Sequence, residues 1–203
     1  SWDNSGLQVG DRNAEIHAAL LTVDVTESVV DEAIEKHCDL IISHHPLIFR
    51  GLKQITGSTT QERCIEKAIR HNIAIYSSHT SMDVYLHGVS GKIADKLDII
   101  NYHILCPTTD DNVGLGVIGE LKTPMKSDDF IHFVQNIFDC SLRYIKPCDE
   151  NITTVAICGG AGAEFITQAI AEGADIYITA DRKYHEVQAA YGQIGVIDLD
   201  HWT

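Results

Sequence analysis

The chain of 203 residues is 44% hydrophobic and 22% charged, which is typical of a soluble globular protein with one or two domains. No apolar run approaches the roughly 20 residues that a membrane-spanning helix needs, which argues against an integral membrane protein. The net charge of −14 argues against nucleic acid and membranes as partners and suits a cation-binding protein, although an acidic surface that only aids solubility is the alternative.

Strands and helices are predicted to alternate in the first half of the chain. Apolar stretches predict strands over 18–26, 39–43 and 73–78. Helical spacing of apolar residues predicts helices over 27–37, 59–72 and 89–97. Thr26 is placed to cap the first helix, and Thr59 or Thr60 the second. This order predicts an α/β fold, with a parallel or mixed sheet that helices cover.

The second half of the chain repeats the scheme. Strands are predicted over 116–121, 153–160, 175–180 and 194–199. Helices are predicted over 127–138, with Ser127 as its cap, and over 163–173, ended by Gly173. The polar stretch 107–112 is the best candidate boundary, so we predict one α/β unit over 1–108 and another over 109–203. Because the chain starts at Ser1 without a methionine, we expect further residues at both ends.

The two halves match in detail. Residues 33–45 align with residues 169–181, which places Ala33 opposite Ala169 and Asp39 opposite Asp175. Residues 72–80 align with residues 193–203 with one insertion, which places His79 opposite His201. We favour a duplication of two similar α/β units. The alternative is that any two such units look alike at this level.

The cysteines indicate a reducing compartment. None of the six belongs to a CxxC pair, so a zinc ribbon has little support and reduced thiols are expected. No secretory signal is visible in the chain. We therefore expect a cytoplasmic protein.

Histidines follow three of the predicted strands. His44 and His45 come directly after the strand 39–43, where Pro46 forces a turn. His79 follows the strand 73–78, with Asp83 one helical turn further on, and His201 follows the last strand. Ligands of open α/β sheets bind outside the carboxyl ends of the strands, so these side chains are expected to converge there.

Neutral imidazole and carboxylate are suitable ligands for zinc or iron, and also for manganese or cobalt. In an extended strand His44 and His45 point to opposite faces, so each is expected to serve a different ion. Five ligands are more than one open tetrahedral site needs, and two divalent metal ions are the natural count. A lone histidine at a strand end is usually only a hydrogen-bonded polar residue, but three such clusters favour metal.

Several sequence blocks resemble the Nif-three-like family, whose members are named GTP cyclohydrolase I type 2 homologs. The resemblance covers nearly the whole chain. Its best blocks are WDNSGLQVG (2–10), IISHHP (41–46), SSHTSMDV (77–84), GVIGEL (116–121), ICGGAG (157–162) and ADIYITADRKYHE (174–186). Together they imply the Nif-three-like fold, a dinuclear metal centre and a homohexameric ring. The stretch 99–160 is too short for the family's inserted domain, so this chain resembles the short form.

The resemblance also implies the ligands. They are His44, His45, His79, Asp83 and His201, with a final glutamate expected four residues beyond the last histidine. The repeat independently predicts a carboxylate at that position. The sequence departs from the family where Ala180 and Asp200 replace glycines, and Asp200 adds a negative charge beside a ligand.

Other polar residues have two interpretations each. Tyr184, His185 and Glu186 would position substrate or move protons, with His185 and Glu186 as the catalytic pair, or they simply begin a solvated helix. Asp3, Asn4 and Gln8 would hydrogen-bond near the centre or, as we prefer, order the N-terminal loop. The turn 158–162 would bind phosphate or, more simply, join a strand to a helix.

Two functions are compatible with these residues. The first is a metal-dependent hydrolase acting on a small molecule, and the resemblance points to ring opening of GTP. Lys183 or Arg182 would help to bind the phosphates. The second is a metal-handling or regulatory scaffold without turnover. Direct nucleic-acid binding is not expected, because no basic patch or recognition helix is visible.

Overall fold

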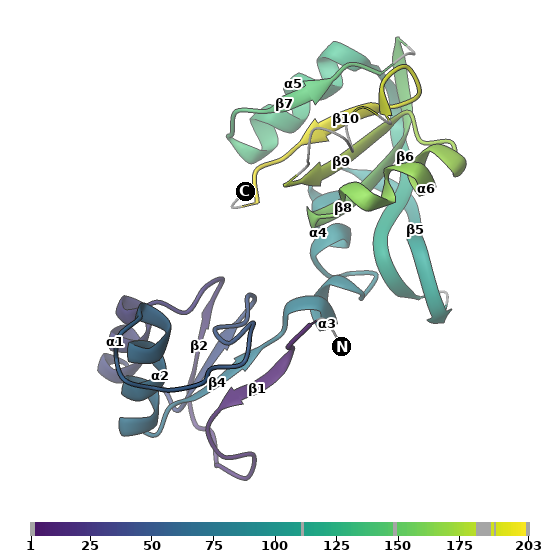
Figure 1. Cartoon of the computed structure of the whole chain (residues 1–203). Coiled ribbons are helices and arrows are strands. Elements are labelled where there is room, and N and C mark those ends of the chain that lie inside the picture. Colours follow the sequence, from purple (N-terminus) through teal and green to yellow (C-terminus); the bar gives the residue numbers. More distant parts are fainter. Residues whose placement is uncertain (1–2, 111, 148–149, 182–187, 189, 202–203) are drawn as a thin grey trace. The chain divides into compact units, whose positions relative to one another are not determined.

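The computed structural model describes residues 3–110, 112–147, 150–181, 188 and 190–201. The chain forms two compact units, Ser1–Met82 and Asp83–Thr203 (Figure 1). The boundary predicted after residue 108 instead falls inside a strand of the second unit, so the chain divides earlier than expected. Nowhere in the described part of the chain does a helix reach the length and apolarity that crossing a membrane demands.

Unit 1 contains a four-stranded sheet in the order β1-β4-β3-β2. Its strands are β1 (Gly6–Val9), β2 (Ala19–Thr22), β3 (Leu40–Ser43) and β4 (Ala74–Ser77). β2, β3 and β4 are parallel to one another, and β1 is antiparallel to β4. Three of the four strands therefore end at the same edge of the sheet, as the alternating pattern predicted.

Two helices cover one face of this sheet, α1 (Glu27–Glu35) and α2 (Thr60–Arg70) (Figure 1). The predicted caps are confirmed, because the side chains of Thr26 and Thr59 accept hydrogen bonds from the first turns of α1 and α2. Ile41 and Ile75 are fully buried between sheet and helices. A short helix, α3 (His79–Asp83), follows β4.

Unit 2 contains a six-stranded mixed sheet in the order β5-β6-β8-β9-β10-β7. The strands are β5 (Ile99–Asp110), β6 (Val113–Lys126), β7 (Arg143–Ile145), β8 (Asn151–Ala161), β9 (Ile176–Ala180) and β10 (Gly195–Asp198). The helices are α4 (Val89–Lys96), α5 (Ser127–Phe138) and α6 (Ile166–Ala171), with a short 3-10 helix η1 (Ala163–Phe165) before α6. The predicted α/β fold with two sheets is confirmed.

Helices cover both faces of the second sheet. Val155 and Ile157 of β8 pack in the cluster that contains residues of α4 and α5. Ala156 and Cys158 pack in the cluster that contains residues of α6. Because alternate residues of β8 face different cores, both faces of the strand are apolar.

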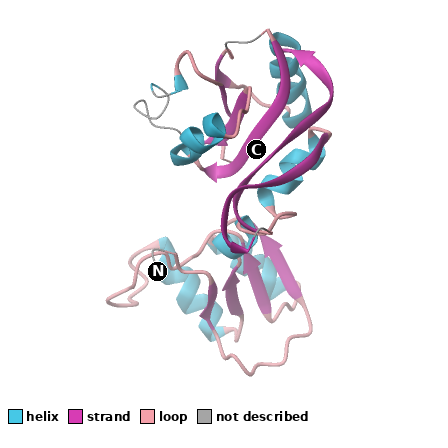
Figure 2. Ribbon diagram, turned by 90° about the vertical axis from the view of Figure 1, so that its right-hand side faces the viewer, coloured by secondary structure: helices cyan, strands magenta, loops and turns pink. Residues whose placement is uncertain are grey.

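Three details of unit 2 differ from the predictions. β5 and β6 form one long twisted hairpin (Figure 2), and the polar stretch 107–112 contains the end of β5 and the turn before β6 rather than a boundary. β5 is an edge strand, which is why it tolerates Pro107. Ser127 does not cap α5, because β6 pairs with β8 as far as Lys126 and the helix follows it directly.

The predicted duplication has a structural counterpart. Asp39 Oδ2 accepts hydrogen bonds from the N–H groups of His17 and Ala18 at 2.8 and 3.3 Å. Asp175 Oδ2 accepts bonds from Thr153 and Thr154 at 2.7 and 2.8 Å. In each unit the aspartate directly precedes a strand and binds the backbone of the parallel neighbour just before the point where their pairing begins. The aligned Ala33 and Ala169 are both fully buried under these strands.

Glu62 in α2 provides a test of local stability. Its Oε2 accepts hydrogen bonds from Thr56 N–H and Thr56 Oγ1 and from Ser58 N–H, at 2.8, 2.9 and 3.1 Å. These bonds, the backbone bond of Thr56 first, lower the pKa of the Glu62 carboxyl although burial opposes them. A carboxyl with a lowered folded pKa stabilises the fold above its unfolded pKa, about 4.3 for glutamate, and this stabilisation disappears as the pH falls through the folded pKa.

We therefore expect Glu62→Gln to lower the urea midpoint at pH 7 and to differ less from the unsubstituted protein at pH 3. Urea unfolding followed by circular dichroism at both pH values measures this. Glu35→Gln, at an exposed position of α1, is the control and should change neither midpoint. A Glu62→Gln deficit that is equal at pH 3 and pH 7 would contradict the expectation.

Candidate metal centre

Two buried serines hold the turn that carries His44 and His45. Ser43 and Ser77, the last residues of β3 and β4, are 1% and 0% exposed. Ser43 Oγ donates to the carbonyl oxygen of His45, and Ser77 Oγ donates to that of His44, both at 2.8 Å. The hydroxyl groups of the two serines thus fix the carbonyl groups of His44 and His45, and the two imidazoles extend from a rigid backbone.

His79 is tied to the same turn. Its N–H donates to the carbonyl oxygen of His44 at 2.9 Å, and its φ of +24° lies outside the usual region for a side-chain-bearing residue. Backbone outliers of this kind persist only where surrounding bonds hold them, and they gather at functional sites. Asp83 ends the helix that His79 begins, four residues further on.

The three imidazoles of unit 1 lie together, as predicted. The ring centres are 4.8 Å apart for His44 and His45, 5.8 Å for His44 and His79, and 6.1 Å for His45 and His79. Two imidazoles that bind one ion at about 2.1 Å have ring centres about 5 Å apart. The observed spacing is therefore close to that of imidazoles around one ion or two adjacent ions.

Carboxylates hold two of these imidazoles through Nδ1. His45 Nδ1 is 2.9 Å from Asp24 Oδ1, and His79 Nδ1 is 2.5 Å from Asp3 Oδ1. A neutral histidine that donates Nδ1–H to a carboxylate carries its lone pair on Nε2, which is the nitrogen that a metal would take. Both carboxylates come from chain segments distant in sequence, and neither pair was predicted from local motifs.

Asp24 has a further feature that fits a bound cation. Its second oxygen, Oδ2, is buried and has no hydrogen-bond partner among the described residues. A buried carboxylate oxygen without a donor is costly unless positive charge lies near it. The donor set of unit 1, three imidazoles backed by two carboxylates, therefore fits divalent metal ions.

Asp3 belongs with the imidazoles rather than with the loop. Burial raises the pKa of its carboxyl, but hydrogen bonds from Ser5, His79, Thr80 and Asn4 outweigh burial and lower the pKa to about 2. Asp3 is thus an ionised acceptor for His79 at neutral pH. Asn4 and Gln8 order the loop instead, as preferred from the sequence, because both bind the backbone of Ile48.

His201 has an arrangement of the same kind within unit 2. Its Nδ1 is 2.6 Å from Asp181 Oδ2, and Asp181 has a left-handed φ of +53°. His201 lies in a hollow of about 650 Å³. The residues that line it are Ser141, Leu142, Arg143, Asp181, Asp198, Asp200 and His201. Asp200, predicted to lie beside a ligand, is in this hollow, but the carboxylate that orients His201 through Nδ1 is Asp181.

The glycine-rich stretch 158–162 forms the end of β8 and leads into η1, and it does not resemble a phosphate cradle. Gly159 N–H donates to Ser90 Oγ and Gly162 N–H donates to Thr179 Oγ1, both at 3.1 Å. These donors serve the fold, which supports the simpler interpretation of the motif. Burial raises the pKa of the Cys158 thiol to about 12, so this cysteine is no nucleophile.

Two predictions remain, the catalytic pair and a complete set of metal ligands. His185 and Glu186, predicted to be catalytic, lie outside the described residues, as do Arg182, Lys183 and Tyr184. Among the residues that the structure describes, no three histidine, cysteine or acidic side chains already form a complete ligand group. The rings of His44, His45 and His79 lie close together, but their nitrogen atoms do not surround a common point as the ligands of a bound ion would.

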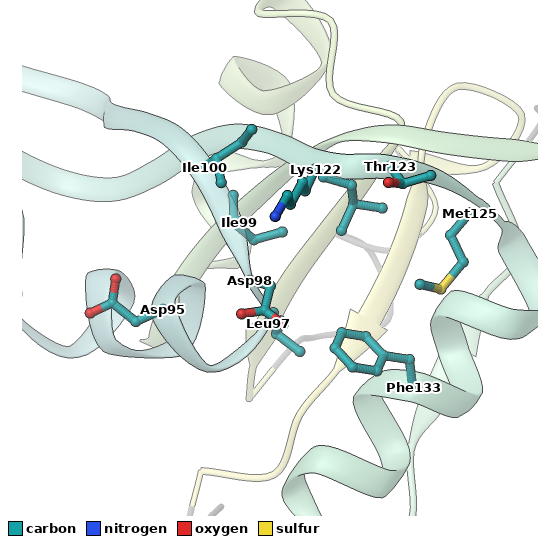
Figure 3. Close-up of a pocket in the computed structure, with 10 residues that line it drawn as sticks. Asp95, Leu97, Asp98, Ile99, Ile100, Lys122, Thr123, Met125 and Phe133 are labelled. Carbon is teal, nitrogen blue, oxygen red and sulfur yellow. The ribbon is translucent and has the colours of Figure 1, made fainter.

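A second hollow of about 570 Å³ in unit 2 contains none of the predicted site residues. Figure 3 shows Phe133 and Met125 on one side of it and Leu97, Asp98 and Ile99 on the other. Its walls combine apolar side chains with exposed charged residues. We assign no role to this hollow.

Comparisons with known proteins agree with the resemblance found in the sequence. A family model described as Duf34/NIF3 (NGG1p interacting factor 3) matches residues 1–203. A protein of Clostridium acetobutylicum named GTP cyclohydrolase 1 type 2 homolog is 36% identical over 206 residues, which cover 99% of this chain and 76% of that protein. The crystal structure of a Bacillus cereus protein related to NIF3 matches with a TM-score of 0.92 at 26% identity, over 99% of this chain and 83% of that one.

A more distant relative indicates that this chain is a short form. A GTP cyclohydrolase 1 type 2 homolog of Bacillus subtilis is 27% identical, and the alignment covers 99% of this chain and 83% of that protein. That alignment runs over 309 residues, although this chain has only 203. The relative therefore contains an insertion that this chain lacks.

The hydrogen bond between Asp24 and His45 predicts the tautomer of the imidazole. We expect His45 to carry its proton on Nδ1 in the metal-free protein at neutral pH. Asp24→Ala should shift the population toward the Nε2–H form, and Asp24→Asn, which keeps an acceptor oxygen, should shift it less. ¹⁵N chemical shifts of the imidazole nitrogens measure this. A His45 spectrum that Asp24→Ala leaves unchanged would show that the carboxylate does not orient the ring.

Proposed function

Because the chain belongs to the Duf34/NIF3 family, we propose that it binds two divalent metal ions and acts as a metal-dependent hydrolase. The proposed ligands are His44, His45, His79, Asp83 and His201. Zinc or iron is the first choice, and manganese or cobalt is the alternative. The observation that carries the proposal is that His45, His79 and His201 each meet an aspartate at Nδ1.

This pattern favours metal binding over the simpler interpretation of hydrogen-bonded polar residues. A histidine that only caps a strand needs one partner and no particular tautomer. Here three histidines have the same kind of partner on the same nitrogen, which is the usual second sphere of a metal-bound imidazole. Asp3, Asp24 and Asp181 would raise the basicity of Nε2 and hold each ring in one orientation.

The proposed chemistry follows from the donor set. When bound, a pair of divalent ions would lower the pKa of water toward neutrality and stabilise negative charge that develops on the substrate. The chain's own residues fix the imidazoles through Ser43, Ser77 and the aspartates, so little reorganisation is needed during the reaction. His185 and Glu186 stay candidates for proton transfer. GTP, other nucleotides and phosphoesters are the proposed substrate classes.

The net charge of −14 is consistent with this proposal. Two divalent ions would offset four negative charges. A nucleotide would otherwise meet a repulsive surface, so cations bound at the site would be needed to attract it. A homohexameric ring, which the resemblance implies, is a further proposal that light scattering on the purified protein would test.

Elemental analysis of the purified protein tests the metal proposal. We expect about two ions per chain in the unsubstituted protein, and a loss of at least one ion per chain in His45→Ala and in His201→Ala. His132→Ala, at an exposed position of α5, is the matched control and should keep both ions. Metal content that is far below one ion per chain after loading, or equal in all four proteins, would contradict the proposal.

Turnover tests the hydrolase proposal separately. Metal-loaded protein is incubated with GTP, other nucleotides and phosphoesters, and products are separated by chromatography. We expect turnover that is lost in His45→Ala and kept in His132→Ala. If two ions are bound and no substrate of the panel reacts, the chain is better described as a metal-handling or regulatory scaffold.

A further inference from the structure

An exposed aromatic side chain lies beside the imidazoles of unit 1. Phe49 is 48% exposed, and its ring centre is 6.2 Å from that of His79, with the two ring planes 86° apart. The loop that carries Phe49 begins directly at the histidine turn. Any ligand that reaches His79 from this side therefore meets an aromatic ring.

The other large apolar side chains of this loop are less exposed than Phe49. Leu47, Ile48 and Leu52 are partly buried and pack against the core of unit 1. Phe49 is not part of that core. The loop thus packs three apolar side chains inward but leaves Phe49, its largest apolar residue, exposed beside the candidate metal ligands. The exposure of the Phe49 ring costs the fold hydrophobic stabilisation.

Polar side chains hold the start of this loop in place. The N–H of Ile48 donates to Gln8 Oε1 at 2.8 Å, and the side chain of Asn4 donates to the carbonyl oxygen of Ile48. The side chain of Gln61 in α2 donates to the carbonyl oxygen of Leu47. Ile48 is therefore held through both its N–H and its carbonyl group, and Leu47 through its carbonyl group, which lowers the entropic cost of presenting the Phe49 ring to a ligand.

The same loop carries positive charge. Arg50 and Lys53 are exposed. Several other basic side chains of unit 1 pair with carboxylates on the helices, namely Arg63 with Glu27, Lys67 with Asp31 and Arg70 with Glu66. In the described part of unit 1, Arg50 and Lys53 take no part in these pairs. In a chain with a net charge of −14, a loop with two cations and an aromatic ring is suited to a planar anion.

We propose that Phe49, with Arg50 and Lys53, forms the recognition surface for a nucleotide, whose base stacks on the Phe49 ring while its phosphate meets the two cations. Stacking on an aromatic ring tolerates any base, because every base has a π-face. This inference rests on the proposed function for its location beside the metal ligands, and it narrows the substrate class to nucleotides.

Binding of two matched probes tests the proposal. AMP carries both a base and a phosphate, whereas ribose 5-phosphate carries only the phosphate. Isothermal titration calorimetry on the metal-loaded protein measures both affinities. Removal of a stacking ring weakens base binding about 5- to 150-fold. We expect Phe49→Ala to weaken AMP binding by such a factor and to leave ribose 5-phosphate unchanged, with Phe49→Tyr restoring AMP binding and Phe49→Leu failing to do so.

The cations and a control complete the experiment. Arg50→Gln combined with Lys53→Gln should weaken both probes. Tyr191→Ala removes an aromatic side chain that is 79% exposed in unit 2 and should change neither affinity. Circular dichroism confirms that each variant is folded.

The outcomes separate this proposal from the metal proposal. It is overturned if the unsubstituted protein does not bind AMP, if AMP binds no more tightly than ribose 5-phosphate, or if Phe49→Leu binds AMP as well as Phe49→Tyr does. If the protein takes up no metal on loading but still binds AMP in a manner that depends on Phe49, the recognition surface is supported and the metal proposal fails.

Discussion

Parallel pairing of neighbouring strands is the constraint on which the candidate metal centre depends. β2, β3 and β4 pair in register, so that Thr22, Ser43 and Ser77 end at one edge of the sheet. Asp24, His45 and His79 follow those ends within two residues and meet there although they are distant in sequence. Asp39 fixes the beginning of β2 beside β3 at the opposite end, so a carboxylate far from the imidazoles sets their register.

The two units place aspartate and histidine differently on a similar scaffold. In unit 1, the strand-end position after β3 is His45, and the carboxylate comes from Asp24 after β2. In unit 2, the corresponding position is Asp181, and the imidazole is His201 after β10. The same strand end therefore supplies an imidazole in one unit and an orienting carboxylate in the other.

The sequence predicted the parts of the structure that depend on local chemistry. The caps at Thr26 and Thr59, the buried strands and the gathering of His44, His45 and His79 all follow from spacing and side-chain type. The carboxylate partners required tertiary information, because Asp3 and Asp24 lie 76 and 21 residues from the histidines that they contact. Applying the strand-end rule to β2 would have identified Asp24. The edge strand β5 was missed because Pro107 and polar residues conceal its alternation.

The hydrogen bond from His79 N–H to the His44 carbonyl joins the turn after β3 to the first residue of α3, which follows the neighbouring strand β4. This bond couples the turn that carries His44 and His45 to the residue that carries the third imidazole, His79. Heating would separate the rings only by breaking this edge of the sheet, so we expect the arrangement of the three imidazoles to be lost together with the fold of unit 1 in a single cooperative transition. Ions bound as proposed at this edge of the sheet would therefore lose their ligands when the unit melts.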